Sequence, residues 1–530
     1  MTTPDDAKLE DLRRDTGAAA PGRGPELLRA WLARAAAAHP EKPYLVCVED
    51  GRAIGYAELA RTAARIAAHL AARGIGANSR VVLLANNSLE HLAVYVGVLA
   101  AGATICTVHV EMNRSHFGAI LPALAPRLVL YEEGLGLEAL AGQTSAPWRP
   151  LGRWERGGGV GFFADLAAPD PAPAARAQSA EDDAAARDAV IFFTSGTSAR
   201  PKGVVLTYRE LLPNAAATAE AFGLGPDDRL YDYRSFNWAS AQILSALATL
   251  SVGATLLLGR KFSRSRFFAD IARYEATVAT GNPTVLGMLL QGDDAVRGAD
   301  LPHLRFITSS SAPLLVEEWR RFEQRFGIPV AQGYGSSETG WIAGCTDKTK
   351  RYGSVGEPLP YLCLSVVDRE GRALAPGEIG HVEVGGLGAN AYRYIDEDGR
   401  MRVNATGRVR TGDMGFLDAD GYLHLTGREK DLIIRGGVNI SPLEIDNVLL
   451  ELPGIAEAAT IGVPDKIYGE EVVSVVVLKP GEALAAADIL AFCAARIPAF
   501  KAPKQIVFRT GLPKTERGKL DRKVLVEEWR

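Results

Sequence analysis

The chain has 530 residues, more than one hydrophobic core usually holds, so we expect at least two domains. Hydrophobic residues make up 47% and charged residues 23%, and the formal net charge is -4, which argues against nucleic acid or an anionic membrane as the main partner. The five cysteines do not have the spacing of metal ligands. The sequence contains no run of about 18 apolar residues, so we do not expect a membrane span. The polar N-terminus lacks a secretory signal, so the expected compartment is the cytoplasm.

The first part of the chain predicts strands in alternation with helices. Residues 1–24 are rich in Asp, Arg, Gly and Ala and are expected to form a flexible leader. Hydrophobic periodicity then predicts helices at 27–32, 57–73 and 89–101, and strands at 44–48, 80–84 and 104–108. This alternation favours a parallel sheet with helices on both faces.

A connector then leads into the most informative loop. Residues 167–188 are dominated by Ala, Pro, Asp and Glu, which is typical of a solvated segment. The apolar strand 189–193 follows and runs into Thr194-Ser195-Gly196-Thr197-Ser198-Ala199-Arg200-Pro201-Lys202-Gly203. Hydroxyl residues and glycines after a buried strand let backbone N–H groups wrap phosphates, and Lys202 would add a positive charge. The pattern of a Walker loop is absent.

This loop resembles the signature loop of the adenylate-forming (AMP-binding) superfamily, which includes acyl-CoA synthetases, firefly luciferase and the adenylation domains of peptide synthetases. Further motifs follow in the family's order, so the resemblance covers nearly the whole chain. It implies an α/β fold with a large N-terminal AMP-binding domain of parallel-rich sheets, residues 25–429, and a small mobile α+β domain, residues 430–530. It also implies ATP, Mg²⁺ and CoA as cofactor and substrates.

Two further motifs belong to the expected ATP site. The segment Gln332-Gly333-Tyr334-Gly335-Ser336-Ser337-Glu338 is similar to the family's YGxTE motif. Tyr334 can stack on adenine, Ser337 can bond the α-phosphate, and Glu338 can hold Mg²⁺, which prefers carboxylate and phosphate oxygens; Thr194 is a weaker metal-ligand candidate. The turn Ser309-Ser310-Ser311-Ala312-Pro313 resembles one that lines the adenine and acyl sites, with serines in place of glycines, which restricts the backbone.

The remaining nucleotide motifs lie toward the C-terminus. Asp413, in Thr411-Gly412-Asp413, can accept hydrogen bonds from both ribose hydroxyls. The segment Gly427-Arg428-Glu429-Lys430-Asp431 resembles the family's GRxKD motif, which implies that Arg428 contacts ribose or phosphate and that Lys430 is the hinge. The string 513–522 resembles PKTxxGKxxR and makes Lys519 the catalytic lysine, together with Glu338 and Lys202. A lysine here can stabilise the charge that grows on the α-phosphate during attack.

The resemblance implies two half-reactions. A substrate carboxylate first attacks the α-phosphate of ATP and pyrophosphate leaves, so that no enzyme nucleophile is needed. A thiol then attacks the acyl-adenylate after the C-terminal domain has rotated at Lys430. Arg435, Gly436 and Gly437 would then line the pantetheine tunnel, although a plain hairpin turn is the alternative reading of the two glycines.

The expected acyl pocket consists of Phe236, Asn237, Trp238, Ser310, Gly335 and Trp341. Asn237 stands where many family members carry His, and a neutral residue there argues against an amino acid as substrate. Gly335 would leave room for an acid longer than acetate. Arg234 either pairs with a second carboxylate or a polar group on the acid, or is structural or faces the nucleotide side, and the second of these interpretations is favoured.

The function predicted from these motifs is an AMP-forming acyl-CoA ligase acting on a carboxylic acid. A stand-alone enzyme that loads a carrier-protein pantetheine is the main alternative, and a luciferase-like oxygenase or a non-catalytic nucleotide-binding relative are remoter ones. The five charged residues Lys202, Glu338, Asp413, Arg428 and Lys519 are all retained, which argues against the non-catalytic relative. The acid and the oligomeric state, including a homodimer, stay open.

Overall fold

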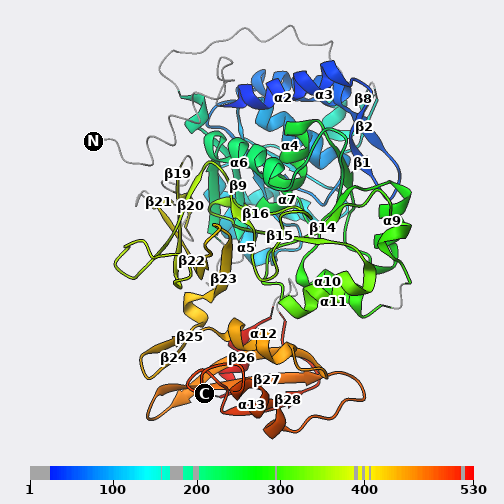
Figure 1. Cartoon of the computed structure of the whole chain (residues 1–530). Helices are drawn as coiled ribbons and strands as arrows, with labels where there is room; N and C mark the ends of the chain where they lie inside the picture. The colour runs from blue at the N-terminus through cyan, green and yellow to red at the C-terminus, as the bar shows by residue number, and fades with distance from the viewer. Residues whose placement is uncertain are drawn as a thin grey trace.

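The computed structural model describes residues 24–156, 158–166, 183–194, 202–292, 295–386, 392–396, 400–404, 408–514 and 520–529. Residues 1–23 of the expected leader, most of the predicted connector, the loop residues Ser195–Ser198 and the predicted catalytic Lys519 lie outside this part. Figure 1 shows a large body above a smaller one, which holds the last strands and helices of the chain. Within the described residues, no helix is long and apolar enough to cross a membrane.

The largest sheet has nine strands and is mainly parallel. Their order and bounds are β17 (Glu357–Pro358), β16 (Gly340–Gly344), β15 (Val330–Ser336), β14 (Phe306–Ser309), β13 (Val278–Ala279), β11 (Arg229–Asp232), β12 (Thr255–Leu258), β1 (Pro43–Cys47) and β2 (Ala53–Gly55). The six strands from β15 to β1 pair in parallel, whereas β16, β17 and β2 join through antiparallel pairs at the two edges. The inner strands β12 and β14 are buried along their whole length because both faces of the sheet are covered.

A second sheet has eight strands. In order they are β21 (Met401–Asn404), β20 (Tyr392–Ile395), β10 (Lys202–Thr207), β9 (Asp188–Thr194), β4 (Thr104–Thr107), β3 (Arg80–Leu84), β5 (Leu128–Tyr131) and β6 (Trp148–Pro150). Its half from β9 to β6 is parallel, and its other half, from β9 to β21, is antiparallel. The parallel-rich architecture predicted from the sequence therefore holds for the inner strands of both sheets.

Helices cover both faces of both sheets, as predicted. One apolar cluster joins the two sheets to the helices α2 (Pro25–Ala38), α3 (Tyr56–Ala71), α4 (Leu89–Ala100), α6 (Tyr208–Ala221) and α8 (Ala248–Val252), and to a π-helical segment, η4 (Gln242–Leu247). The outer face of the nine-stranded sheet carries α9 (Arg264–Arg273), α10 (Pro283–Leu290) and α11 (Val316–Phe326), and that of the other sheet carries α5 (Arg114–Leu124). The side chains alternate accordingly: Leu230 of β11 faces the central cluster and Tyr231 the outer one.

Two further sheets complete the chain. A four-stranded antiparallel sheet, which the sequence did not predict, contains β18 (Leu362–Val367), β19 (Gly380–Gly386), β22 (Val409–Leu417) and β23 (Leu423–Arg428). The lower body in Figure 1 is built on β25 (Val438–Ile440), β24 (Ile433–Arg435), β27 (Gly469–Leu478), β26 (Ile455–Asp465) and β28 (Gln505–Arg509), with α12 (Pro442–Leu450), α13 (Ala486–Ala494) and α14 (Arg522–Glu527). This body has its own apolar core, which centres on Ile445, Val472 and Ile489.

Candidate active site

Four neighbouring parallel strands of the nine-stranded sheet end in polar residues. Asp232 is the last residue of β11, Thr280 follows β13, Ser309 is the last residue of β14, and Tyr334 lies near the end of β15. Because the strands run in the same direction, these residues lie at one edge of the sheet. Ligands of open α/β sheets bind outside this carboxyl edge, so it is the candidate site.

The serine turn that follows β14 presents polar atoms at this edge. Ser309 and Ser310 are buried, and their Oγ atoms have no hydrogen-bond partner among the described residues. Ser311 has a φ of 73°, in the left-handed region that costs energy for any residue except glycine. The serine at this position therefore strains the backbone, while Ala312 is half-buried and Pro313 is exposed.

The structure brings together three of the predicted nucleotide-site residues. The Tyr334 hydroxyl donates a hydrogen bond to Asp413 Oδ2, and Arg428 Nε lies 3.0 Å from Asp413 Oδ1. Asp413 and Arg428 face each other across β22 and β23, so this cluster joins the four-stranded sheet to the carboxyl edge of the nine-stranded sheet. Burial and the Asp413 carboxylate raise the pKa of Tyr334 above its ordinary value, which keeps the phenol protonated as a donor.

The glycines beside Tyr334 are required by close packing. A Cβ on Gly335 would lie 2.4 Å from the carbonyl oxygen of Gly340 in the paired strand β16, and a Cβ on Gly333 would lie 2.5 Å from the Trp341 ring. The interpretation of Gly335 as room for a longer acid is therefore incomplete. Backbone approach between β15 and β16 already demands glycine there, whatever the acid.

The residues after β15 form a short polar turn. Ser336 Oγ lies 2.9 Å from Thr339 Oγ1 and accepts a hydrogen bond from the Thr339 N–H, while Ser337 and Glu338 are partly exposed. The described residues contain no group of three or more His, Cys, Asp or Glu side chains that could hold a metal. A single carboxylate such as Glu338 fits Mg²⁺ nonetheless, because this ion is commonly held by one or two carboxylates together with substrate phosphates.

Lys202 marks the far end of the predicted phosphate loop. It is the first residue of β10 and pairs in register with Thr194, the last residue of β9. Its ammonium group lies 5.5 Å from the centre of the Tyr394 ring. The loop between the two strands, including Ser195, Gly196, Thr197 and Ser198, falls outside the described residues, as does the side chain of Thr194.

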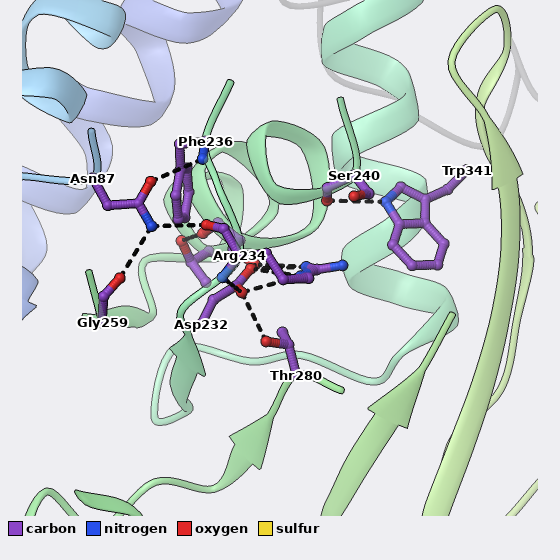
Figure 2. A network of polar contacts seen from close by, with 10 residues as sticks. Asn87, Asp232, Arg234, Phe236, Ser240, Gly259, Thr280 and Trp341 are labelled. Atoms are coloured by element: carbon purple, nitrogen blue, oxygen red, sulfur yellow. Dashed lines mark hydrogen bonds and ion pairs between the residues drawn. The ribbon is translucent and has the colours of Figure 1, made fainter. Parts of the chain in front are cut away.

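The segment that follows β11 contains three of the predicted acyl-pocket residues, Phe236, Asn237 and Trp238, and a buried asparagine holds it in place (Figure 2). Asn87 Nδ2 donates to the carbonyl oxygens of Arg234 and Gly259 at 2.8 and 3.0 Å, and Asn87 Oδ1 accepts from the Phe236 N–H at 2.9 Å. Asn237, the residue in place of the usual histidine, donates to Ala85 O at 3.0 Å. Sequence reasoning missed Asn87, whose contacts span about 150 residues of chain.

Two tryptophans lie near this segment. Trp238 stacks on His109 with ring centres 5.5 Å apart. Trp341 is buried, its backbone N–H and carbonyl are both bonded by the side chain of Asn214, and its indole N–H lies 3.4 Å from Ser240 O. Trp341 therefore has a fixed position across the carboxyl edge from Arg234 (Figure 2).

Arg234 forms a buried ion pair that the sequence analysis did not identify. Its Nη2 lies 2.8 Å from Asp232 Oδ2, and both side chains are buried. Its Nε and Nη2 make three hydrogen bonds to Asp232 and one to Ser245, which is a structural role of the kind that the sequence analysis favoured for this arginine. The partner Asp232 was missed, although its position two residues earlier at a strand end was a usable signal.

The C-terminal candidates lie on the lower body or on its connection. Lys430 is exposed in the 3-10 turn Glu429–Asp431, which links β23 to β24. Gly436 and Gly437 have φ values of 56° and 83° and form the hairpin turn between β24 and β25, the alternative that the sequence left open. Arg435 pairs with Glu471 at 2.6 Å and stacks on Tyr468.

Comparison with known proteins agrees with this geometry. The AMP-binding enzyme family matches residues 32–392, and the AMP-binding enzyme C-terminal domain matches residues 444–519. The sulfoacetate–CoA ligase of Cupriavidus necator is 32% identical over 94% of this chain and 97% of its own length, and the indoleacetate–CoA ligase of Aromatoleum aromaticum is 33% identical over 93% and 96%. ATP-bound MatB from Rhodopseudomonas palustris has a similar crystal structure, with a TM-score of 0.79 at 28% identity over 94% of this chain and 99% of that one.

Two curated relatives above 30% identity, matched over nearly their whole length, are CoA ligases, and the family match covers more than half of the chain. The chain therefore belongs to the AMP-binding enzyme family, in its branch of AMP-forming acyl-CoA ligases.

Proposed function

We propose that this enzyme activates a carboxylic acid as its acyl-adenylate at the carboxyl edge of the nine-stranded sheet and then transfers the acyl group to the thiol of CoA. The observation that carries the proposal is the contact of Tyr334, Asp413 and Arg428, because the carboxylate that we expect to bind the ribose then lies beside the end of β15. The relatives act on acids as different as sulfoacetate, indoleacetate and oxalate, so they do not identify the acid used here.

In the first half-reaction, a carboxylate oxygen of the acid forms a bond to the α-phosphorus of ATP, and the bond to the departing pyrophosphate breaks. Asp413 accepts hydrogen bonds from the ribose hydroxyls, and Lys202 and Lys519 place positive charge on the phosphates. Catalysis in this scheme consists of positioning and electrostatic stabilisation. Mg²⁺ held by Glu338 would supply charge neutralisation on the phosphates.

In the second half-reaction, the CoA sulfur forms a bond to the acyl carbonyl carbon, and the bond from that carbon to the phosphate oxygen of AMP breaks. AMP leaves, and the thiol proton passes to solvent. The body that carries Lys519 turns at Lys430 between the two steps and brings Arg435, Gly436 and Gly437 to the thiol substrate. The exposed position of Gly436 and Gly437 in the β24–β25 turn supports this scheme. Residues 25–429 and 430–530 are then the two functional domains.

The test separates the half-reactions. Lys519→Ala is expected to lower acid-dependent pyrophosphate release by about a thousandfold, in the range seen when a group that stabilises transition-state charge is removed. Thioester formation from supplied acyl-adenylate is expected to change little. Lys523→Ala, four residues away on α14, removes the same charge and is the matched control. Equal loss in both half-reactions would contradict the two-conformation scheme.

The acceptor is tested with the same protein. Wild-type enzyme, ATP and an acid panel are incubated with CoA or with a holo carrier protein, and the acylated thiol is identified by mass spectrometry. Acyl-CoA as the main product supports the proposal. Acylation of the carrier protein alone would replace it by the loading function.

A further inference from the structure

In the Asp232–Arg234 ion pair at the carboxyl edge, hydrogen bonds fix the position of the Asp232 carboxylate. Asp232 has no exposed surface, and its oxygens accept hydrogen bonds from Arg234 Nε at 3.0 Å, from Arg234 Nη2 at 2.8 Å and from Thr280 Oγ1 at 2.7 Å. Ser245, on the π-helical segment, donates to the same carboxylate. The aspartate is therefore saturated, and what it does is hold the guanidinium in one orientation.

The guanidinium of Arg234 has hydrogen-bond donors that are not satisfied within the described chain. Arg234 is only 5% exposed, and its Nη1, which carries two N–H donors, has no hydrogen-bond partner among the described residues. Figure 2 shows the side chain extending away from Asn87 toward the side of the site where Trp341 lies. A buried charged donor without an acceptor is costly, so such a group in a native protein requires an explanation, and a ligand that supplies the acceptor is one.

The same edge holds other buried polar atoms in this condition. Gln242 Nε2 donates to Phe236 O and Thr107 Oγ1, both at 2.8 Å, which fixes the amide and leaves Oε1 unpaired. The Oγ atoms of Ser309 and Ser310 are also buried without partners in the described part of the chain. Sites for long apolar acyl chains are lined by apolar side chains, so this edge is suited to a polar substrate.

We propose that Arg234 binds, through Nη1, a second oxyanion at the end of the acid opposite the carboxylate that is activated. The substrate class is then an acid with a terminal carboxylate or sulfonate, and Arg234 is its specificity residue. Asp232 is a positioning residue, because it acts only through the guanidinium. A guanidinium fits this role because its N–H groups match the geometry of planar or tetrahedral oxyanions. The inference rests on the proposed adenylation at this edge.

The experiment measures kcat/KM for acid-dependent pyrophosphate release. The acids are propanoate and its derivatives with a terminal hydroxyl, carboxylate or sulfonate, together with the next longer members of each series. The wild type is expected to prefer a carboxylate or sulfonate derivative over the unsubstituted acid by about 10- to 100-fold, the range for hydrogen bonds to a charged group. Which of the two oxyanions is better distinguishes a dicarboxylic from a sulfonated substrate.

Two variants assign this preference to the ion pair. Asp232→Asn/Arg234→Gln removes both charges without leaving either one buried alone, and it is expected to abolish the preference for the oxyanion. Arg234→Lys keeps the charge and is expected to retain part of it. The matched control is Asp228→Asn/Arg305→Gln, which removes an ion pair of 2.9 Å at the opposite, amino-terminal edge of the same strands and should keep the wild-type preference.

Several outcomes would overturn the inference. A wild type that uses propanoate or its hydroxyl derivative as well as the charged acids has no oxyanion site. An equal loss for every acid in Asp232→Asn/Arg234→Gln, with an unchanged preference, would make the pair purely structural. The wild-type panel decides even if this variant fails to fold, which its thermal midpoint reveals. Pyrophosphate release with no acid at all would instead refute the proposed function.

Discussion

The stability of the contact between the lower body and α11 is expected to depend on pH. Replacing Glu318 by glutamine is expected to remove most of this dependence. Glu318 lies in the first turn of α11, which contacts the lower body. Burial raises the pKa of Glu318 to about 7; nearby Glu457 acts in the same direction, and Arg321 and Lys514 oppose it. Glu457 and Lys514 belong to the lower body and pair with each other at 3.1 Å. The raised pKa is therefore a property of the contact between the two bodies.

The sign and the magnitude follow from this shift. A carboxyl group with a raised pKa contributes its full share of stability below its ordinary value of 4.5 and loses it as the pH rises through about 7. At about 1.4 kcal/mol per pKa unit, the rise from 4.5 to about 7 sets an upper limit of about 3.5 kcal/mol, and partial contact with solvent reduces the expected cost at pH 8 to about 1–3 kcal/mol. Glutamine stays neutral and avoids this cost.

The docked contact can be followed at one backbone group. The Val316 N–H donates to Asn447 Oδ1 of α12 at 3.1 Å, and Leu315 packs against the core of the lower body. Hydrogen exchange of this segment, corrected for the intrinsic pH dependence, is measured at pH 5.5 and pH 8. Wild type and the control Glu317→Gln should lose protection at the higher pH, and Glu318→Gln should not. An equal loss in Glu318→Gln, or weaker protection than wild type at pH 8, would refute the reasoning.

Three further predictions follow from packing and charge. Gly335→Ala is expected to cost about 1–3 kcal/mol in urea unfolding because its Cβ meets backbone, whereas Gly225→Ala, in open space, is neutral; an effect on acid preference alone would restore the earlier reading of this glycine. Asp413→Asn is expected to raise the KM for ATP by about tenfold or more in pyrophosphate-release assays, and an unchanged value would remove Asp413 from the nucleotide site. Arg522→Met removes the ion-pair partner of buried Asp446, whose pKa is raised by burial, and is expected to cost about 3–5 kcal/mol of stability. Adding Asp446→Leu to this variant should recover most of the lost stability, as measured by thermal unfolding.

Much of the fold could be predicted where local pattern and burial agree. The strand at 80–84 was predicted with its observed bounds, and the helices at 57–73 and 89–101 differ from α3 and α4 by one or two residues at their ends. Their apolar residues are buried on a helical stripe or as a continuous run, which periodicity detects. The strands β18 and β23 are mostly half-buried, and the four-stranded sheet to which they belong was not predicted from the sequence.

The site could be predicted only where residue type carried the information. Tyr334 and Asp413 were found through their motifs, and the structure joins them across 79 residues. Asn87 and Asp232 were missed, because what they do depends on partners that the fold supplies: Asn87 bonds Arg234, 147 residues away. The reason that the sequence offered for Gly335 was incomplete, since the steric demand for glycine comes from a neighbouring strand.

Under the proposed function, the contact of Asp413 with Arg428 also gives a way in which nucleotide binding could affect the position of the lower body. Arg428 is the last residue of β23 and directly precedes the turn Glu429–Asp431 that leads to β24. Ribose hydroxyls that bond Asp413 would compete with Tyr334 and Arg428 for the same two oxygens. Binding and release of the nucleotide would therefore change the restraint on the residue where the connection begins. An ion pair directly before a connecting segment can shift the conformations of that segment in this way, without any contact between the nucleotide and the body that moves.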